Sequence, residues 1–407
     1  MSTPSYQQVL GRKIAAERRR RGLSQPELAR LLGRSVAWVS QVERGVRKID
    51  RMSVLEALAT ALEVPLSELA AEAPVVAAVT EKPPGAAGLR LVLSGAYALR
   101  AMLDDRRLSA LSTLRARSRK AWELTHAGQY TELAELLRGL VPDLETSARA
   151  APESQRAEVF ELMAATYQAC SAALAKLGEP EAAWIAADRA MAAAERAGNP
   201  LLVAAGAFRL VHVFLAARHH DQAEETARTA TDALQSRADS GDPPAMSLWG
   251  GLTLQRAVIA SRMNNPDAAY AHLERAAQVA ARLGEGRNDF NTEFGPANVS
   301  LHEIAVAVEL GDAGRALRAA AVVDATGLSA ERRARMLMDV ARAHAQRRRV
   351  TEAVAALRQA EDISPEMVGG HEQVRQVVAD LLAMQDPPSA ELRELADQVG
   401  AVRLRSK

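Results

Sequence analysis

The sequence is poor in cysteine, in aromatic residues and in long apolar runs. Its single cysteine, Cys170, excludes an internal disulfide and the usual zinc site, and its place in an apolar helical run predicts a buried, inert thiol. No run approaches the roughly 18 apolar residues that a membrane-spanning helix needs, and the N-terminus has no secretory core. We therefore expect a cytoplasmic protein without a transmembrane segment.

Catalytic motifs are also lacking. The sequence contains no phosphate-binding glycine loop that ends in Lys and Ser or Thr, no His-Glu-x-x-His and no Gly-x-Ser-x-Gly. His219 and His220 adjoin Asp221, but two neighbouring histidines without further converging ligands are more typical of an exposed turn than of a metal centre. The sequence therefore predicts no enzyme, no cofactor and no metal site.

Residues 24–45 predict two short capped helices joined by a tight turn. Ser24, followed three residues later by Glu27, forms a capping box at the start of the first helix. This helix is expected to end at about Leu32, because the glycine that follows can adopt the left-handed conformation that ends helices. Ser35 can cap the second helix. Two helices in this arrangement are typical of a motif that places its second helix in the DNA major groove.

The helical period divides this second helix into two faces. Val39 and Val42 are predicted to face inward, beside Ala29 and Leu32 of the first helix. The outer face is predicted to carry Val36, Ala37, Trp38, Gln41 and Arg44. Gln41 is by geometry the best candidate for direct readout, because an amide can form two hydrogen bonds with adenine. The alternative is a glutamine that faces water.

Residues 9–70 resemble the Cro/C1-type helix-turn-helix family, also called the XRE family. The register is carried by Gly22-Leu23-Ser24-Gln25, Glu27-Leu28-Ala29, Gly33, Ser35, Val39-Ser40-Gln41-Val42-Glu43-Arg44-Gly45, Leu55, Leu58-Ala59 and Ala61-Leu62. The resemblance implies a DNA-binding domain of five helices in which Gln25 donates to a backbone phosphate. It also implies that Val36, Ala37 and Gln41 touch base edges.

Three residues of this region have more particular expectations. Trp38 stands where the family often has a small polar residue, so we expect it to pack against sugar and phosphate or to touch a thymine methyl group. Arg18 and Glu43 occupy positions that form an internal ion pair in family members. The resemblance therefore implies that Glu43 aligns Arg18 and does not touch DNA.

The N-terminal region is basic, whereas the rest of the chain is slightly acidic. Residues 1–72 hold twelve Lys or Arg and eight Asp or Glu, a net charge of +4, and the remaining residues have a net charge of −3. Cations beside the second helix can neutralise phosphates and give salt-dependent affinity. These cations are Arg34, Arg44, Arg47, Lys48 and Arg51, and Ser35 completes the candidate DNA contacts. The run Arg18–Arg21 is equally well explained as a solvated helix end.

Composition marks the domain boundaries. The DNA-binding domain is assigned to residues 1–72, and residues 73–89 are expected to form a linker, because they lack helical periodicity and contain three prolines and two glycines. Residues 90–385 have apolar residues at helical spacing throughout and no strand-like alternation. Residues 386–407 are expected to form a capping helix and tail. The fold class is therefore all-α.

Similar turns recur along residues 90–385. They are Gly178-Glu179-Pro180-Glu181-Ala182, His219-His220-Asp221-Gln222-Ala223, Asn264-Asn265-Pro266-Asp267-Ala268, Gly311-Asp312-Ala313-Gly314-Arg315-Ala316 and Arg349-Val350-Thr351-Glu352-Ala353, with a degenerate first unit at Gly128-Gln129-Tyr130-Thr131-Glu132-Leu133. Between the final alanines the steps are 41, 45, 48 and 37 residues. This pattern resembles the tetratricopeptide superfamily, whose repeats of about 34 residues also consist of helix, turn, small residue and helix. It implies an α-solenoid of stacked helix pairs.

Counting back from each turn alanine predicts a polar stripe on the concave face of this solenoid. Its candidate ligand-binding residues are Gln168, Arg209, His212, Asn298, His302, Arg335, Asp339 and Arg342, bordered by small side chains such as Ala205 and Gly250. Small residues leave room for an extended ligand while Arg, His and Asn supply hydrogen-bond donors. The alternative is that these are solvated residues of a curved scaffold.

Residues 287–298 interrupt the repeats with amides, acids and two phenylalanines. Ordinary turns between repeats do not need such chemistry. We therefore add Asn291 and Glu293 to Asn298 and His302 as candidate contacts to a ligand or partner. A capped loop that stabilises the next helix is the alternative.

These features together predict a bacterial transcription regulator whose repeat domain senses a signal. The arrangement resembles the peptide-responsive regulators of the RRNPP group, and this resemblance implies a peptide effector and a homodimer. Leu381, Leu382, Leu392 and Leu395 suit either a dimer contact or a cap on the last repeat. Two alternatives stay open for the repeat domain: it only dimerises the DNA-binding domains, giving an effector-independent repressor, or it binds a protein partner as an adaptor.

Overall fold

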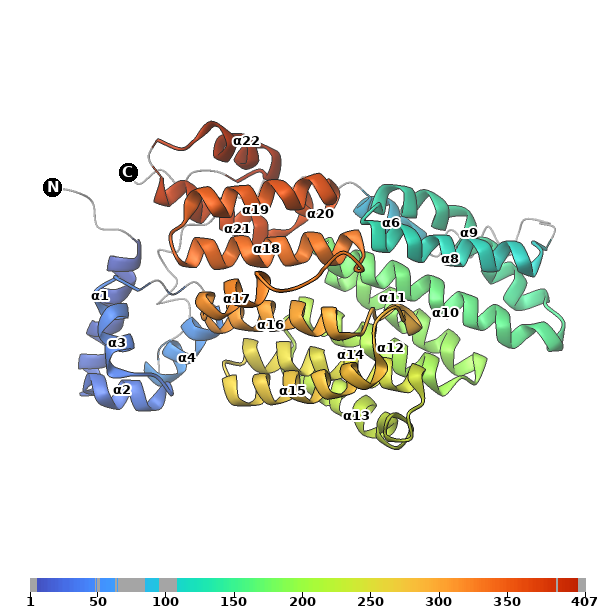
Figure 1. Cartoon of the computed structure of the whole chain (residues 1–407), viewed down its shortest axis with the longest axis horizontal. Helices are drawn as coiled ribbons and strands as arrows, with labels where there is room; N and C mark the ends of the chain where they lie inside the picture. Colours follow the sequence, from blue (N-terminus) through green and yellow to red (C-terminus); the bar gives the residue numbers. More distant parts are fainter. Residues whose placement is uncertain are drawn as a thin grey trace. The chain divides into compact units, whose positions relative to one another are not determined.

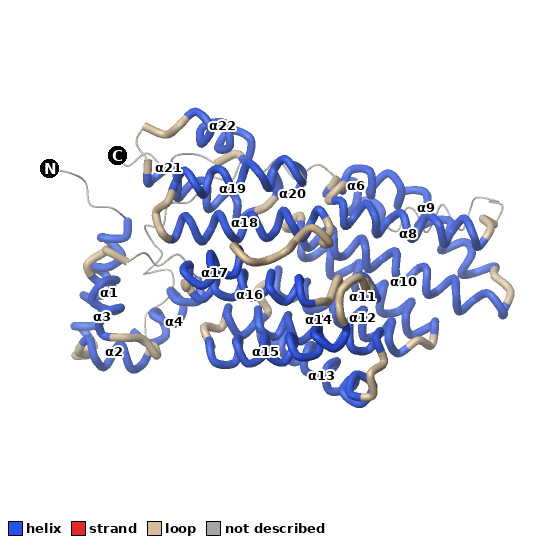
Figure 2. Tube along the Cα trace, viewed as in Figure 1, coloured by secondary structure: helices blue, strands red, loops and turns tan. Residues whose placement is uncertain are grey.

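The computed structural model describes residues 6–47, 49, 52–62, 64, 85–94, 108–385 and 387–401. Contacts divide the chain into two compact units, one formed mainly by Met1–Val79 and the other by Thr80–Ala401. Figure 2 shows helices joined by loops throughout both units, as the all-α prediction requires. The predicted fifth helix of the first unit and the greater part of the predicted linker lie outside the described residues.

The N-terminal unit contains four described helices (Figure 1). They are α1 (Tyr6–Arg20), α2 (Gln25–Leu31), α3 (Val36–Glu43) and α4 (Met52–Leu62). The predicted caps are confirmed, because Ser24 and Glu27 form a capping box at α2 and the Ser35 side chain accepts a hydrogen bond from the Trp38 N–H at the start of α3. The small core includes the buried side chains of Leu10, Ile14, Leu28, Val39 and Leu58.

The second unit consists of helix pairs. After α6 (Ala86–Val92), the pairs are α8 (Leu111–Ala127) with α9 (Tyr130–Ala150), α10 (Glu153–Lys176) with α11 (Pro180–Ala197), α12 (Pro200–Ala216) with α13 (His220–Asp239), α14 (Pro243–Arg262) with α15 (Pro266–Leu283), α16 (Pro296–Leu310) with α17 (Ala313–Ala320) and α18 (Ala330–Gln346) with α19 (Val350–Ile363). The short α20 (Pro365–Gly370), then α21 (Glu372–Met384) and α22 (Ala390–Val399) follow. The predicted turns therefore each separate two helices, including the degenerate first unit.

One type of turn joins the helices within every pair named above. Its first residue has a left-handed backbone with φ between 60° and 81°, and the six residues are Gly128, Gly178, Arg218, Asn264, Gly311 and Arg348. The N–H of the next residue donates to the carbonyl five residues earlier, as from His219 to Phe214 at 2.8 Å. This is a Schellman motif, which satisfies carbonyl groups that the end of the first helix leaves unpaired.

The structure corrects the register of two repeats. In each pair, the fourth residue after the N-cap of the second helix is fully buried. These residues are Leu133, Ala183, Ala223, Ala269, Ala316 and Ala353. The sequence alignment placed Ala182 and Ala268 in this column, one residue too early. The error arose because two alanines adjoin each other at both turns, and only the backbone shows which one packs inward.

The first helices of the pairs form a closed ring. Contacts link α8 to α10, and then α12, α14, α16 and α18 in succession, and α18 in turn contacts α8. An ion pair between Lys176 of α10 and Glu331 of α18 (3.0 Å) and a hydrogen bond from the Thr131 N–H to Glu366 of α20 (3.2 Å) tie the beginning of this unit to its end. One apolar core accordingly contains residues of both ends, such as Leu137 and Leu381.

Both edges of this unit differ from expectation in detail. The predicted linker includes residues 86–89, but these belong to α6, where Ala86 and Leu89 are fully buried against the following repeats. At the other end, the leucines at 381, 382, 392 and 395 are buried within the chain, which favours the cap over the dimer contact.

Two expectations about composition can be compared with the structure. Cys170 is fully buried in α10, as predicted, and burial raises the pKa of its thiol to about 12. Within the described ranges, no helix combines the length and the apolar character needed to cross a bilayer.

Candidate nucleic-acid interface and repeat-domain interior

The helix α3 is held in place by close packing against α1. A Cβ atom at Gly11 of α1 would run into the carbonyl oxygen of Val42 and lie 2.7 Å from that of Glu43. The two backbones can therefore approach this closely only at a glycine. This contact fixes the angle at which α3 presents its outer face.

The outer face of α3 agrees with the prediction at most positions. Val36, Ala37 and Arg44 are exposed, and Gln41 is half-buried with a side-chain amide that has no hydrogen-bond partner among the described residues. Arg44 folds back so that its Nε donates to the Ser40 carbonyl (3.2 Å). An unpaired amide beside small exposed side chains suits contact with base edges.

Trp38 corrects the prediction, because its side chain is 9% exposed and belongs to the core. Its indole lies beneath the guanidinium of Arg34, whose Cζ is 5.4 Å from the ring centroid. Burying so large an apolar ring stabilises a small domain more than leaving it on the surface. Arg34 is half-buried over this ring.

The predicted pair of Arg18 and Glu43 is confirmed. Arg18 donates to Glu43 through Nε at 2.5 Å and through Nη2 at 3.1 Å, and the Gln25 amide donates to the same carboxylate at 2.7 Å. Burial would raise the pKa of Glu43, but the hydrogen bonds from Arg18 and Gln25 outweigh it and lower that pKa. Gln25, expected to contact a phosphate, thus holds α3 through Glu43.

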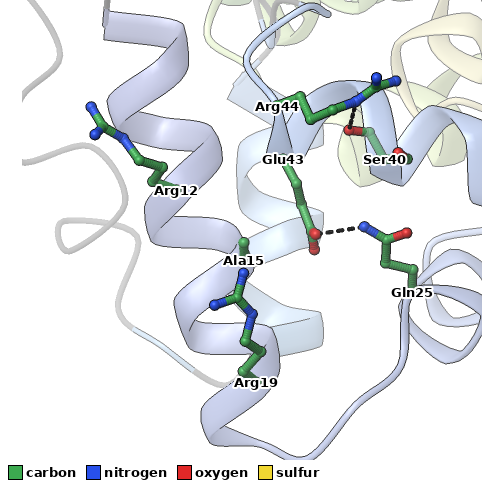
Figure 3. Close-up of a pocket in the computed structure, with 7 residues that line it drawn as sticks. All are labelled: Arg12, Ala15, Arg19, Gln25, Ser40, Glu43 and Arg44. Atoms are coloured by element: carbon green, nitrogen blue, oxygen red, sulfur yellow. Dashed lines mark hydrogen bonds between the residues drawn. The ribbon is translucent and has the colours of Figure 1, made fainter. Parts of the chain in front are cut away.

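Figure 3 shows a pocket of about 520 Å³ beside this network. Arg12 and Arg19 line it from α1, and Arg44 lines it from the end of α3. Gln25 and Glu43 point toward each other between them. Arginines on two helices around one depression can contact a phosphate group.

The interior of the repeat domain is occupied by the chain itself. Residues 284–295, which connect α15 to α16 and include the 3₁₀ helix η1 (Asp289–Asn291), are hereafter called the interior segment. Arg209 of α12 donates through Nη2 to the carbonyl oxygens of Phe290 (3.0 Å) and Asn291 (2.9 Å). Its guanidinium also lies 4.7 Å from the ring centroid of Trp122 in α8. Burial lowers the pKa of Arg209 to about 9, which leaves it cationic at neutral pH.

Glu293 is the most densely bonded residue of the interior segment. Its carboxylate accepts hydrogen bonds from the Ser329 N–H (3.1 Å), the Ser329 hydroxyl (3.1 Å) and Arg332 Nε (3.3 Å), and His126 Nδ1 lies 3.2 Å away. Burial opposes ionisation, but the neighbouring His126 and the charge of Arg332 lower the pKa of Glu293 far below its usual range. Two elements distant in sequence, α8 and the start of α18, therefore converge on one carboxylate.

The backbone of the interior segment is strained. Phe290, Asn291 and Glu293 have φ values of 50°, 56° and 50°, a region that costs non-glycine residues about 1–3 kcal/mol each. Phe294 is buried against α14, where a Cβ atom at Gly250 would overlap its ring. The surrounding contacts must hold this conformation in place.

Asn298 and His302 of α16 also serve the interior segment. The Asn298 amide donates to the carbonyl oxygens of Thr292 (3.3 Å) and Glu293 (2.9 Å). His302 Nδ1 bonds to the Asn298 carbonyl (2.9 Å), its Nε2 lies 3.3 Å from the Gln255 amide, and burial lowers its pKa to about 4. These contacts favour the alternative of a capped loop at these two residues.

Three predicted ligand residues form a separate charge network along α18. Arg342 bridges Asp339 (3.0 Å) and Glu309 of α16 (2.8 Å). Arg335 lies 3.8 Å from Asp339 and 2.5 Å from His371 Nε2. The structure therefore brings Arg335, Asp339 and Arg342 together, but as partners of one another.

The remaining two candidates are bonded within their surroundings. Gln168, 2% exposed, donates to the Leu202 carbonyl (3.4 Å), and His212 Nδ1 bonds to the Phe208 carbonyl (2.8 Å). The predicted stripe is therefore not an open surface. Sequence spacing could not show this, because the interior segment that contacts Arg209 and Asn298 comes from a loop.

Comparison with known proteins assigns the N-terminal unit. Residues 9–71 match the helix-turn-helix domain family. This unit is a helix-turn-helix domain. A search of curated proteins found no match to the chain.

One solved structure matches the chain at low similarity. The crystal structure of PlcR from Bacillus thuringiensis in complex with the peptide PapR7 and DNA is 14% identical, with a TM-score of 0.30 over 68% of this chain and 95% of that chain. A TM-score this low does not show a common arrangement of the helices. The chain therefore joins a helix-turn-helix domain, the kind of domain that binds DNA, to a domain of helical repeats.

The structure adds residues that the sequence interpretation missed. In the helix-turn-helix domain they are Arg12 and Arg19, whose spacing of seven residues on one helix could have placed them on one face. In the repeat domain they are His126, Ser329 and Arg332, for which no local pattern exists. Arg47 is exposed beyond α3, and Lys48 and Arg51 lie outside the described residues.

Proposed function

We propose that this regulator recognises a specific operator through the outer face of α3. The observation that carries the proposal is the Gln41 amide, which has no hydrogen-bond partner among the described residues and stands with Val36, Ala37 and Arg44 on a face that Gly11 holds in position. A bidentate amide contact with adenine contributes about 1–3 kcal/mol of discrimination. Phosphate contacts from Arg12, Arg19, Arg34, Arg44, Arg47 and Lys48 would supply the salt-dependent part of the affinity, and Ser35 would hold the start of α3 in place.

The regulator is proposed to act as a homodimer in the cytoplasm. One α3 helix meets only a few base pairs, so two copies on half-sites about 34–36 Å apart would combine their discrimination. The repeat domain would join the two copies and bind a peptide or small ligand. A ligand that moves the equilibrium from 1:99 to 99:1 must prefer one arrangement by about 5.5 kcal/mol.

Operator selection tests the role of α3. The double variant Gln41→Ala, Arg44→Ala should lose selection of the operator from a random DNA library and bind at least tenfold more weakly, because about 1–3 kcal/mol of base contact is removed. Arg228→Ala, which removes an exposed cation from α13, is the matched control and should select the same sites. Unchanged selection by a folded double variant would refute the proposal.

The self-bonded interior favours a second candidate function. If the contacts of Arg209, Asn298 and His302 are permanent, the repeat domain only dimerises the DNA-binding domains, and the protein is an effector-independent repressor. Equal operator affinity in cell extract and in purified buffer would support this candidate. Dialysable material that changes the affinity would exclude it.

A further inference from the structure

The repeat domain binds its own interior segment in the way that a peptide-binding protein binds a ligand. Arg209 contacts two consecutive main-chain carbonyl groups, at Phe290 and Asn291, and Arg332 Nη2 donates to a third, at Thr292 (3.3 Å). Contacts to main-chain carbonyl groups recognise a non-helical chain whatever its side chains are. The helices that supply these arginines, α12 and α18, are far apart in sequence from the segment.

Two further contacts recognise particular side chains. The donors of Ser329 and Arg332, with His126 beside them, surround the carboxylate of Glu293. The ring of Phe294 fills the space above Gly250 of α14. An acidic residue followed by an aromatic residue is thus selected by one polar and one apolar pocket.

We propose that this place is the effector site of the regulator, that its ligand is a short acidic peptide with an aromatic residue after the acid, and that the interior segment is a tethered occupant which the peptide displaces. The inference rests on the proposed function, because it names the ligand class of the predicted signal-binding domain. It also explains why Arg209 and Asn298, two of the predicted ligand residues, are bonded to this segment.

The geometry of the segment makes displacement feasible. Three of its non-glycine residues, Phe290, Asn291 and Glu293, are held at positive φ, a strain that the free segment would lose. A tethered occupant acts at a high effective concentration, so the site is open for only a fraction of the time. The apparent affinity of the free peptide equals its intrinsic affinity multiplied by this fraction.

The chain supplies its own probe for a binding experiment. The labelled peptide Arg-Asn-Asp-Phe-Asn-Thr-Glu-Phe copies residues 287–294, and a second peptide carries Gln in place of Glu. Full-length Glu293→Ala vacates the carboxylate pocket. We expect it to bind the Glu peptide at least about tenfold more tightly than the Gln peptide, as is typical for a hydrogen-bonded charge. The wild type should bind the Glu peptide more weakly than the variant does.

Matched variants separate displacement from general loosening. Glu274→Ala removes an exposed carboxylate from α15 and should behave as the wild type. Adding Gly250→Ala to Glu293→Ala should weaken binding of the Glu peptide, because the new Cβ atom takes the space of the aromatic ring, whereas Gly251→Ala, whose Cβ would lie 3.4 Å from its nearest neighbour, should not. If Glu293→Ala does not fold, Glu293→Gln keeps the side-chain volume and is expected to give the same ranking.

Two results would overturn the inference. A folded vacated variant that binds neither peptide, or that binds both equally, shows that the interior segment is only part of the core. Operator selection by α3 is measured on the same proteins. If selection persists while peptide binding fails, this inference fails alone; if selection fails while peptide discrimination holds, the proposed DNA recognition fails and the peptide site stands.

Discussion

Glu43 in the helix-turn-helix domain and Glu293 in the repeat domain are both carboxylates held by an arginine, together with Gln25 at Glu43 and with Ser329 and His126 at Glu293. Around Glu43 the network is small, and it turns α3 so that an outer face is left exposed. Around Glu293 the network draws on α8 and α18 and covers the face that it organises. The same chemistry thus leaves the outer face of α3 exposed in one domain, whereas in the other it holds the interior segment against the helices.

The largest expected effect is at the contact that leaves the α3 face free. Gly11→Ala should destabilise the helix-turn-helix domain by about 3 kcal/mol and abolish operator binding, because a Cβ atom cannot fit against the carbonyl groups of Val42 and Glu43. Thermal unfolding followed by circular dichroism, together with DNA titration, measures both effects.

The control for this substitution lies in the repeat domain. A Cβ atom at Gly369 in α20 would meet nothing within 4 Å, so Gly369→Ala should leave stability and DNA binding nearly unchanged. Equal stability of the two variants would show that the approach of α1 to α3 is not constrained.

An intermediate effect is expected in the repeat domain, where a fall in pH should lower the free energy of unfolding through His302. Burial lowers the pKa of His302 to about 4 from an ordinary value of 6.5, so the unfolded chain binds a proton in a range where the folded chain does not. His302 therefore contributes stability that is present above pH 6.5 and is lost as the pH falls toward 4. Between about pH 7.5 and about pH 5 this loss amounts to about 2 kcal/mol.

Denaturant unfolding at a series of pH values measures this dependence. The variant His302→Gln, which keeps a donor and an acceptor, should show a shallower fall in the free energy of unfolding over the same range. A variant that keeps the full slope would assign the pH dependence to other groups, such as His272, whose pKa burial also lowers to about 4.

The smallest expected effect is at the repeat turns, which belong to neither candidate site. Arg218 has a φ of 63°, so Arg218→Gly should stabilise the repeat domain by about 1 kcal/mol, because glycine adopts this backbone without a steric cost. Arg218→Ala keeps the Cβ atom and is the control for loss of the charge. Equal melting temperatures of the two variants would contradict the explanation by strain.

Local signals predicted most of the helix-turn-helix domain. Ser24 with Glu27, and Ser35 at the next helix, fix helix starts through hydrogen bonds that span three residues, so a sequence displays them directly. The pair of Arg18 and Glu43 followed from the family resemblance. Trp38 was misplaced because helical period assigns a direction to a side chain, whereas a large ring on a short helix can fold back over its neighbours.

The repeat domain shows where such signals end. The turns were predicted because a left-handed residue followed by a helix start is a local pattern. The environment of Glu293 was not predicted, because His126 lies far before it in the sequence and Arg332 lies well after it. Asn291 and Glu293 were singled out for unusual chemistry, yet only the fold shows that the chain itself supplies their partners.

The contact between α18 and α8 joins the first and last helix pairs, so the array of repeats does not have two free ends. An open array of repeats can fray helix by helix from either end, since each unit touches only its neighbours. In this domain the first and last units protect each other, so loss of either one exposes both. A signal that separates α8 from α18 would therefore open the ring and affect each of its helices.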